Sequence, residues 1–165
     1  MRAVDAIQQK IMVADQMVHL AASWRIRGKK IAFTNGCFDI LHEGHIFSLS
    51  SAAREADFLV VGLNSDESTR GLKGPERPVN SEQSRALLLA SLLIVDAVVI
   101  FNESTPLELI TKLQPDVLVK GGDYQPEQIV GASEVMSWGG RVVINPLVEG
   151  FSTTGLIQRI KSALS

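Results

Sequence analysis

The residues best suited to chemistry in this sequence are two histidines, His42 and His45, which lie three positions apart. They follow a short apolar run at residues 31–34, which predicts a buried parallel strand. Apolar side chains recur at helical spacing after Gly44, so a helix is expected to begin there. The free N–H groups and the dipole at the start of a helix attract anions. Because both histidines can donate to the same anion, the pattern predicts a phosphate site.

The turn between the strand and the histidines suits other chemistry as well. Gly36 allows a sharp turn and a close approach of a phosphate to the backbone. Two histidines near a carboxylate also suit a zinc ion, with Cys37 or Asp39 as further ligands, and a cysteine beside a histidine suits a nucleophile. We favour the phosphate because it explains both Gly44 and the helix start. We expect Cys37 to be a small buried residue.

Basic side chains follow the later predicted strands. Lys73 and Arg77 lie four residues apart within residues 65–80, the longest stretch without a helix or strand pattern. Such stretches are often functional, so we expect a loop here that closes on anionic groups. Arg85, on the next helix, either adds a charge to this site or faces solvent. Lys120 precedes two glycines, where the backbone can approach a ligand closely.

Short apolar runs alternate with segments that carry helix signals along most of the chain. Ser81, Thr105 and Ser152 are suitable caps for three of the helices. Alternation of this kind implies parallel strands joined by right-handed crossovers. The sequence therefore predicts a Rossmann-like, doubly wound α/β fold, with helices on both faces of a parallel five-stranded sheet. The strands are expected at residues 31–34, 58–63, 97–101, 117–119 and 142–144.

The first part of the chain departs from this alternation. Apolar residues recur at helical spacing between Asp5 and Arg27, which predicts one N-terminal amphipathic helix. This helix either covers the sheet or forms the contact of a homodimer, and we favour covering the sheet. We accordingly divide the sequence into an N-terminal helical extension, residues 1–28, and a main domain, residues 29–165.

Composition limits the classes of function. The chain has 165 residues, 45% of them hydrophobic, and a formal net charge of −2. The near balance of charge argues against nucleic-acid binding, and no apolar run approaches the roughly 20 residues that span a bilayer. The polar start does not resemble a secretory signal, and a single cysteine favours the cytoplasm. We therefore expect a soluble, cytoplasmic protein whose partners are small molecules.

The first segment carries a family resemblance. A strand followed by G-x-F-D-x-x-H-x-G-H is the signature of the cytidylyltransferase-like nucleotidyltransferases. The sequence resembles this signature closely, and residues 29–165 would then be the nucleotidyltransferase domain. The matching residues are Gly36, Phe38, Asp39, His42, Gly44 and His45.

Later segments extend the resemblance to about residue 160. Residues 149–154 resemble the family's second signature, which ends in Ser-Thr-Thr, although Leu147 and Val148 stand where relatives carry an arginine. With residues 72–74 and 120–124, the chain looks most like the adenylyltransferase domain that makes ADP-activated heptose for bacterial lipopolysaccharide. In some bacteria that domain is fused to a sugar kinase, whereas here it is expected to stand alone.

The resemblance implies transfer of AMP from ATP to a D-glycero-D-manno-heptose 1-phosphate, with release of pyrophosphate. Mg²⁺ would arrive on ATP, with no metal held by the protein alone. The implied catalytic residues are His42, His45 and Lys73. Asp39 is expected to fix the turn by binding backbone N–H groups. The implied nucleotide-binding residues are Thr34, Asn35, Gly36, Phe38, Gly44, Lys120, Gly121, Asp123, Ser152, Thr153 and Thr154. The implied sugar-phosphate-binding residues are Lys73, Arg77, Asp66 and Arg85.

Two other functions fit the same segments. One is a cytidylyltransferase that acts on glycerol 3-phosphate or another small phosphorylated alcohol. The other, of a different class, is a non-catalytic nucleotide-binding regulatory module. The presence of both histidines and of Lys73 favours an enzyme over such a module.

Overall fold

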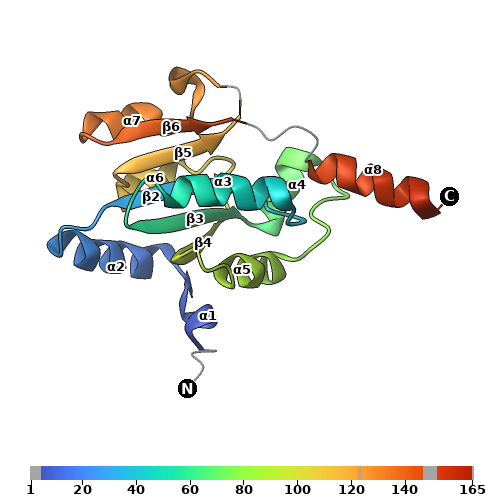
Figure 1. Cartoon of the computed structure of the whole chain (residues 1–165), viewed down its shortest axis with the longest axis horizontal. Coiled ribbons are helices and arrows are strands. Elements are labelled where there is room, and N and C mark those ends of the chain that lie inside the picture. The colour runs from blue at the N-terminus through green and yellow to red at the C-terminus, as the bar shows by residue number, and fades with distance from the viewer. Residues whose placement is uncertain (1–4, 123, 147–151, 165) are drawn as a thin grey trace.

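A parallel sheet lies at the centre of the molecule (Figure 1). The computed structural model describes residues 5–122, 124–146 and 152–164. The strands are β1 (Ile11–Met12), β2 (Ile31–Gly36), β3 (Phe58–Asn64), β4 (Ala97–Phe101), β5 (Val117–Gly121) and β6 (Arg141–Asn145). Their order in the sheet is β1-β4-β3-β2-β5-β6, and all pairs are parallel. The five predicted strands are therefore confirmed as β2 to β6.

Helices cover both faces of this sheet, as expected. One hydrophobic cluster joins the strands to α2, α6 and α7, and a second joins them to α3 and α5. Among the described residues, no helix has the length and apolar character needed to cross a membrane. The helices are α1 (Asp5–Gln9), α2 (Ala14–Ile26), α3 (Glu43–Ala53), α4 (Asp66–Lys73), α5 (Glu82–Ala90), α6 (Leu107–Leu113), α7 (Ala132–Ser137) and α8 (Thr153–Leu164), with a short 3-10 helix, η1 (Pro126–Gln128).

The prediction of a single N-terminal helix was wrong. The segment forms α1 and α2 with the short strand β1 between them, and β1 adds a sixth strand beside β4. The backbone N–H of Val98 donates to the carbonyl oxygen of Lys10 at 2.8 Å. Without β1, β4 would be an edge strand with unpaired backbone groups, and pairing these groups outweighs helix continuity.

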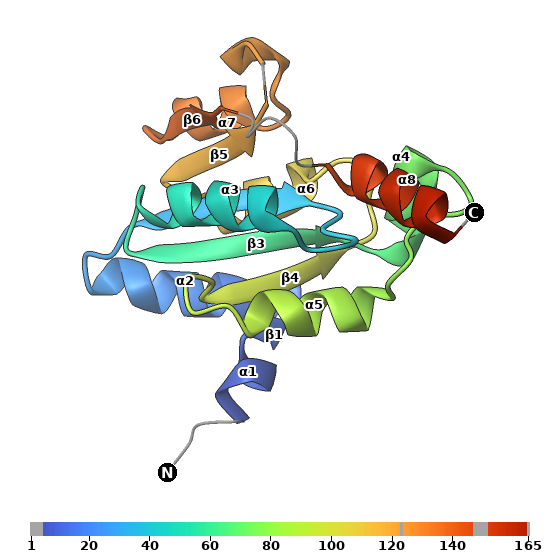
Figure 2. The same ribbon diagram turned by 45° about the vertical axis from the view of Figure 1, so that its right-hand side comes forward.

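The prediction of one long loop at residues 65–80 was also wrong, because its first half forms α4. Ser65 caps this helix by accepting a hydrogen bond from the Ser68 N–H at 3.1 Å. Acidic residues in the first turn and basic residues in the last turn complement the helix dipole. Lys73 therefore lies at the end of a helix rather than within a loop. Figures 1 and 2 both draw α8 beside α4, away from the sheet.

The position of β2 decides where a ligand binds. The chain runs from β2 outward through β3 and β4, then returns to place β5 on the other side of β2. In open α/β sheets, ligands bind beyond the carboxyl ends of the strands where the order reverses in this way. The crevice between β2 and β5 is that place.

The helix α2 covers the sheet, which was the favoured expectation for the N-terminal segment. The ring of Trp24 stacks on that of Phe58, with centroids 4.0 Å apart and an angle of 13° between the planes. Trp24 is only 7% exposed, whereas Ile26 on the same helix is 87% exposed.

We therefore expect Trp24→Ala to lower the free energy of unfolding by about 3–5 kcal/mol, because it removes a large buried ring and leaves a cavity. The matched change Ile26→Ala should alter it by about 0.5 kcal/mol or less. Urea denaturation of both variants measures the difference. Equal effects of the two changes would mean that α2 does not contribute to the core as the contacts indicate.

Candidate active site

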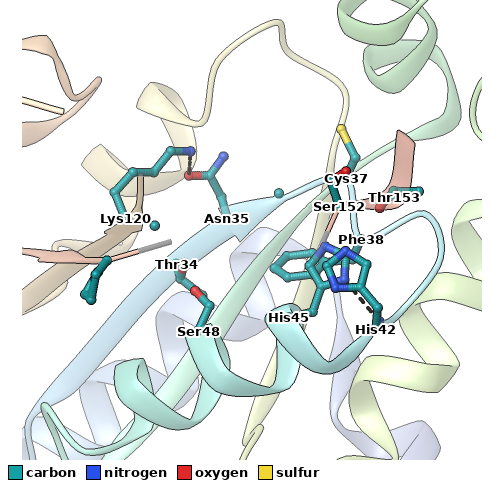
Figure 3. Close-up of a pocket in the computed structure, with 14 residues that line it drawn as sticks. Thr34, Asn35, Cys37, Phe38, His42, His45, Ser48, Lys120, Ser152 and Thr153 are labelled. Atoms are coloured by element: carbon teal, nitrogen blue, oxygen red, sulfur yellow. Dashed lines mark hydrogen bonds between the residues drawn. The ribbon is translucent and has the colours of Figure 1, made fainter. Parts of the chain in front are cut away.

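Two adjoining cavities open at the carboxyl ends of β2 and β5. Figure 3 shows the residues of the first. The first has a volume of about 320 Å³ and the second about 340 Å³. Their linings share residues of β2, the following turn, Lys120 and the start of α8. The first cavity is lined by Thr34, Asn35, Gly36, Cys37, Phe38, His42, Gly44, His45, Ser48, Lys120, Gly121, Pro146, Ser152 and Thr153. Most of the expected nucleotide-binding residues thus surround one space.

The two histidines lie against each other at the start of α3. Their ring centroids are 3.8 Å apart, with an angle of 26° between the planes (Figure 3). The backbone N–H of His42 donates to Nδ1 of His45 at 3.4 Å. Because Nδ1 accepts this bond, the neutral ring of His45 carries its proton on Nε2. His45 is therefore a hydrogen-bond donor through Nε2 even when it is uncharged.

Burial keeps both rings uncharged at neutral pH. It lowers the pKa of His45 to about 4, with a further contribution from the nearby His42. Burial also lowers the pKa of His42 below its ordinary value of 6.5. An anion placed against the rings would stabilise their charged form and raise both pKa values.

The turn that carries these histidines is held by Phe38. Phe38 adopts a φ of 45°, in the left-handed region, and is 8% exposed. Its ring faces His45 at a centroid distance of 5.3 Å. A Cβ atom at Gly36 would lie 3.1 Å from this ring, so the glycine gives Phe38 room to pack over the strand end. Strained backbone of this kind is often kept at functional sites.

Asp39 ties this turn to the loop before α5. Its carboxylate is buried and accepts hydrogen bonds from the N–H groups of Val79 and Asn80, at 2.8 and 3.0 Å, and from Nε of Arg77 at 2.6 Å. Asp39 thus binds backbone N–H groups, as expected, and these groups belong to the loop before α5. Burial opposes the charged form, but the bonds from Asn80, Val79 and Arg77 outweigh it and lower the pKa of Asp39.

Arg85 does not face solvent, and its role as a ligand of the sugar phosphate is contradicted. The residue is fully buried. Its guanidinium donates to the carbonyl oxygens of Asn80, Cys37 and Asn64 at 3.0, 2.5 and 2.8 Å, and to Asp66 Oδ1 at 2.7 Å. These four bonds use four of the five N–H donors of the guanidinium, which leaves little capacity to bind a phosphate. Arg85 instead holds the ends of β2 and β3 and the start of α4 together, and the Asp66 carboxylate is one of its partners.

Lys120 lies near the end of β5, the strand that pairs with β2. Its ammonium group donates to Asn35 Oδ1 at 3.3 Å (Figure 3). Burial lowers the pKa of Lys120, the nearby Cys37 opposes this shift, and the nearby Lys73 lowers the pKa further. Cys37 is half-buried and lines both cavities, rather than lying buried as expected.

The second cavity brings together the basic residues that the sequence placed in one loop. Lys73, at the end of α4, and Arg77, in the loop beyond it, both line this cavity. The cavity also reaches His45 and Lys120. Lys73 and Lys120 therefore bring positive charge beside the histidine pair from α4 and β5, whereas the charge of Arg77 is paired with Asp39. This arrangement suits a polyanionic ligand.

The start of α8 supplies hydroxyl groups to the same space. Ser152 and Thr153 line both cavities, and Thr154 lines the second. The predicted cap is confirmed, because Ser152 Oγ accepts a hydrogen bond from the Gly155 N–H at 3.0 Å. Residues 147–151, which precede α8 and include the glutamate of the second signature, lie outside the described residues. Asp123 lies outside them as well.

Sequence reasoning missed Ser48 and Asn64. Ser48 lies one helical turn after His45 on α3 and lines the first cavity, so its i+3 spacing was a usable signal. Asn64 ends β3 and lines the second cavity. Its signal was a polar residue that closes an apolar strand at the ligand edge of the sheet.

The zinc alternative loses one of its ligands. The carboxylate of Asp39 is already occupied by Arg77 and two backbone N–H groups, and these bonds favour its hydrogen-bonded role over metal ligation. Within the described residues, no group of three or more His, Cys, Asp and Glu side chains lies close enough to hold a metal ion.

The low pKa of His45 makes stability depend on pH. Because the unfolded ring has a pKa of 6.5 and the folded ring one of about 4, the unfolded chain binds more protons between these values. Stability should therefore fall as the pH falls through this window. Between pH 6.5 and 5 we expect the parent to lose about 3 °C more in Tm than His45→Gln loses. Parallel slopes for both proteins in a thermal melt would show that His45 is not protected from protonation.

Comparisons with known proteins were made for the whole chain. The cytidylyltransferase-like family model matches residues 33–159. The bifunctional protein HldE of Koribacter versatilis (strain Ellin345) is 55% identical over 156 residues, which are 94% of this chain and 32% of that protein. HldE of Syntrophotalea carbinolica (strain DSM 2380 / NBRC 103641 / GraBd1) is 56% identical over 92% of this chain and 31% of that protein. The chain spans about a third of the length of these curated relatives.

Two solved structures are also similar. The lipopolysaccharide core biosynthesis protein from Thermoplasma volcanium GSS1 has a TM-score of 0.61 and 27% identity, over 73% of this chain and 98% of that protein. The pantoate-beta-alanine ligase from Francisella tularensis has a TM-score of 0.60 and 17% identity, over 92% of this chain and 76% of that protein, and shows the shared fold alone.

Proposed function

We propose that this chain, which belongs to the cytidylyltransferase-like family, transfers AMP from ATP to a heptose 1-phosphate and releases pyrophosphate. The product would be an ADP-heptose for the core of lipopolysaccharide. The observation that carries this proposal is the stacked pair of His42 and His45 at the start of α3, in one cavity with Lys120, Ser152 and Thr153.

The similar proteins support the choice within the family. The relatives at 55 and 56% identity are each named bifunctional, and the chain matches about a third of their length, which fits one of their two functions. A solved relative at 27% identity is named for lipopolysaccharide core biosynthesis. The cytoplasm, where ATP is abundant, is the compartment that we propose.

The reaction needs little covalent help from the protein. A sugar phosphate is already an anionic nucleophile at neutral pH, so it would attack the α-phosphorus in line without a general base. One P–O bond forms to the sugar phosphate, and the bond to the leaving pyrophosphate breaks. Charge grows on the oxygens around the α-phosphorus, so catalysis rests on positioning and on donors aimed at these oxygens.

The side chains around the cavities suit these tasks. Nε2–H of His45 would donate to an α-phosphate oxygen, and His42 to an adjacent oxygen. Lys73 and Lys120 would offset the charge of the phosphates from two sides. The hydroxyl groups at the start of α8 would hold the leaving pyrophosphate.

Magnesium would enter with the nucleotide. Mg²⁺ prefers oxygen ligands and keeps several waters, so it is often held by phosphates rather than by protein alone. The cavities present histidines, lysines and hydroxyl groups, a donor set that fits Mg²⁺ held mainly by the triphosphate. There it would neutralise part of the charge on the phosphates.

The proposal is tested by release of pyrophosphate over a grid of ATP, CTP, GTP and UTP against heptose 1-phosphate, glucose 1-phosphate and glycerol 3-phosphate. We expect ATP with heptose 1-phosphate to give the highest kcat/KM, at least about tenfold above other pairs, which corresponds to about 1.4 kcal/mol. Equal or faster turnover with CTP would reject the heptose assignment and favour a cytidylyltransferase. No turnover with any pair would favour a regulatory module.

Lys73 offers a separate test of the second cavity. Lys73 is exposed at the end of α4, so Lys73→Ala should leave Tm nearly unchanged. It should lower kcat/KM about 10²-fold or more, because one charged contact to the transition state is lost. Arg70→Ala, an exposed basic residue on the same helix, is the control and should keep parental activity. A large fall in Tm with activity per folded molecule preserved would make Lys73 structural.

The histidine pair should matter for turnover more than for ATP binding. If the rings donate to oxygens that gain charge in the transition state, His45→Ala should bind ATP within a few-fold of the parent. Its kcat should fall about 10²–10³-fold, the usual effect of losing one such donor. His42→Ala should behave similarly, and the double variant should lose less than the product of both effects. Weaker ATP binding with unchanged kcat would contradict the transition-state role.

A further inference from the structure

A third cavity lies beside the other two, on the side away from the histidine pair. Its volume is about 230 Å³, below the roughly 300–1,000 Å³ of sites for drug-sized ligands. It opens between the loop after β4 and the segment after β5. Its polar lining includes Asn64, Ser104, Thr105, Tyr124 and Gln128. None of these five residues has a role in the proposed transfer of AMP as described above.

The lining of this cavity has the chemistry of a polyol site. Two hydroxyl groups, a phenol and two amides supply neutral donors and acceptors, which match sugar hydroxyl groups better than they match phosphates. Asn64 is 3% exposed, and its amide nitrogen donates to Ser68 Oγ at 3.0 Å, which fixes the orientation of the amide. Gln128 accepts a hydrogen bond from the Gln125 N–H through Oε1 at 2.9 Å, which leaves its amide nitrogen as a donor.

The ring of Tyr124 is placed by Gly122. Gly122 has a φ of 142°, and a Cβ atom built on it would collide with Cε2 of Tyr124. The absent side chain therefore lets the ring lie directly on the backbone after β5, where it forms a wall of the third cavity. An aromatic face beside hydroxyl and amide groups is suited to the apolar C–H face of a sugar ring.

Lys120 and Asn35 connect this cavity to the site of the reaction. Both residues line all three cavities, so the hydrogen bond from Lys120 to Asn35 lies where the cavities meet. A ligand whose sugar lies in the third cavity would have its phosphate at this ammonium group. From there the phosphate faces the space that holds the histidine pair.

We propose that the third cavity binds the polyhydroxylated body of the acceptor, with Tyr124 and Thr105 as residues that determine its specificity. This inference rests on the proposed function and deepens it. The sugar would then bind the neutral groups between α6 and η1. It would not bind Arg85, whose guanidinium holds the ends of the strands together. Lys73 remains a contact of the acceptor phosphate, and Lys120, expected at the nucleotide, becomes a second one.

Two variants test the inference with D-glycero-D-manno-heptose 1-phosphate as acceptor. Thr105→Val keeps the shape of the side chain and removes one hydroxyl group, so KM for the acceptor should rise about 3–10-fold. Tyr124→Ala removes the aromatic wall, so KM for the acceptor should rise about tenfold or more. In both variants, KM for ATP should stay within twofold of the parental value. Tm should stay within about 2 °C of that of the parent.

The matched control is Thr111→Val, the same change at an exposed position of α6 outside the cavity. It should leave both KM values at the parental level. An active parent whose two cavity variants keep the parental KM for the acceptor would overturn the inference and leave the proposed function intact. A KM for ATP raised by the same factor would overturn it too, by assigning the cavity to the nucleotide. A parent that is inactive with every sugar phosphate would overturn the proposed function itself.

Discussion

The cleft depends on the hydrogen bonds of one buried group, the guanidinium of Arg85. It binds the carbonyl oxygens of Cys37 and Asn64, which follow or end the neighbouring strands β2 and β3, and it pairs with Asp66 at the start of α4. One side chain therefore fixes the ligand edge of the sheet and the helix that carries Lys73. A buried charge is tolerated only when its partners replace water, and four acceptors do so here.

The buried carboxylate of Asp39 makes a second set of contacts at the cleft, with the complementary charge. By binding two N–H groups and Arg77, it keeps the histidine turn against the loop that leads into α5. The histidines are then stacked and half-buried before any ligand arrives, so their donors need little reorganisation when charge develops. Donors fixed in advance in this way account for much of the stabilisation that enzymes give to developing charge.

The charges of the cleft are divided in a way that fits the proposed reaction. The histidines are neutral donors because burial lowers their pKa values. Positive charge around the second cavity comes from Lys73 and Lys120, because Arg77 is paired with Asp39. Phosphates would thus meet cations along the middle of the cleft, with hydrogen-bonding groups at both ends. The third cavity, whose lining is mostly uncharged apart from Lys120 at its junction with the other two, lies at the end where the body of an acceptor would extend.

The sequence by itself determined the strand–helix alternation, five of the six strands, and the histidine turn, because hydrophobic period and a local signature are readable along the chain. Only the tertiary structure decided that Ile11 and Met12 form a strand, since they pair with residues of β4 that lie 87 positions away. The same holds for Arg85, which reads as a surface charge on its helix until the ends of β2 and β3 surround it. The sequence indicated that Asp39 binds backbone N–H groups, but only the fold shows that these groups lie about 40 residues ahead. Hydrophobic period reports which face of an element is buried. It carries no information on which distant backbone groups will meet a buried charge, and the folded chain alone brings these together.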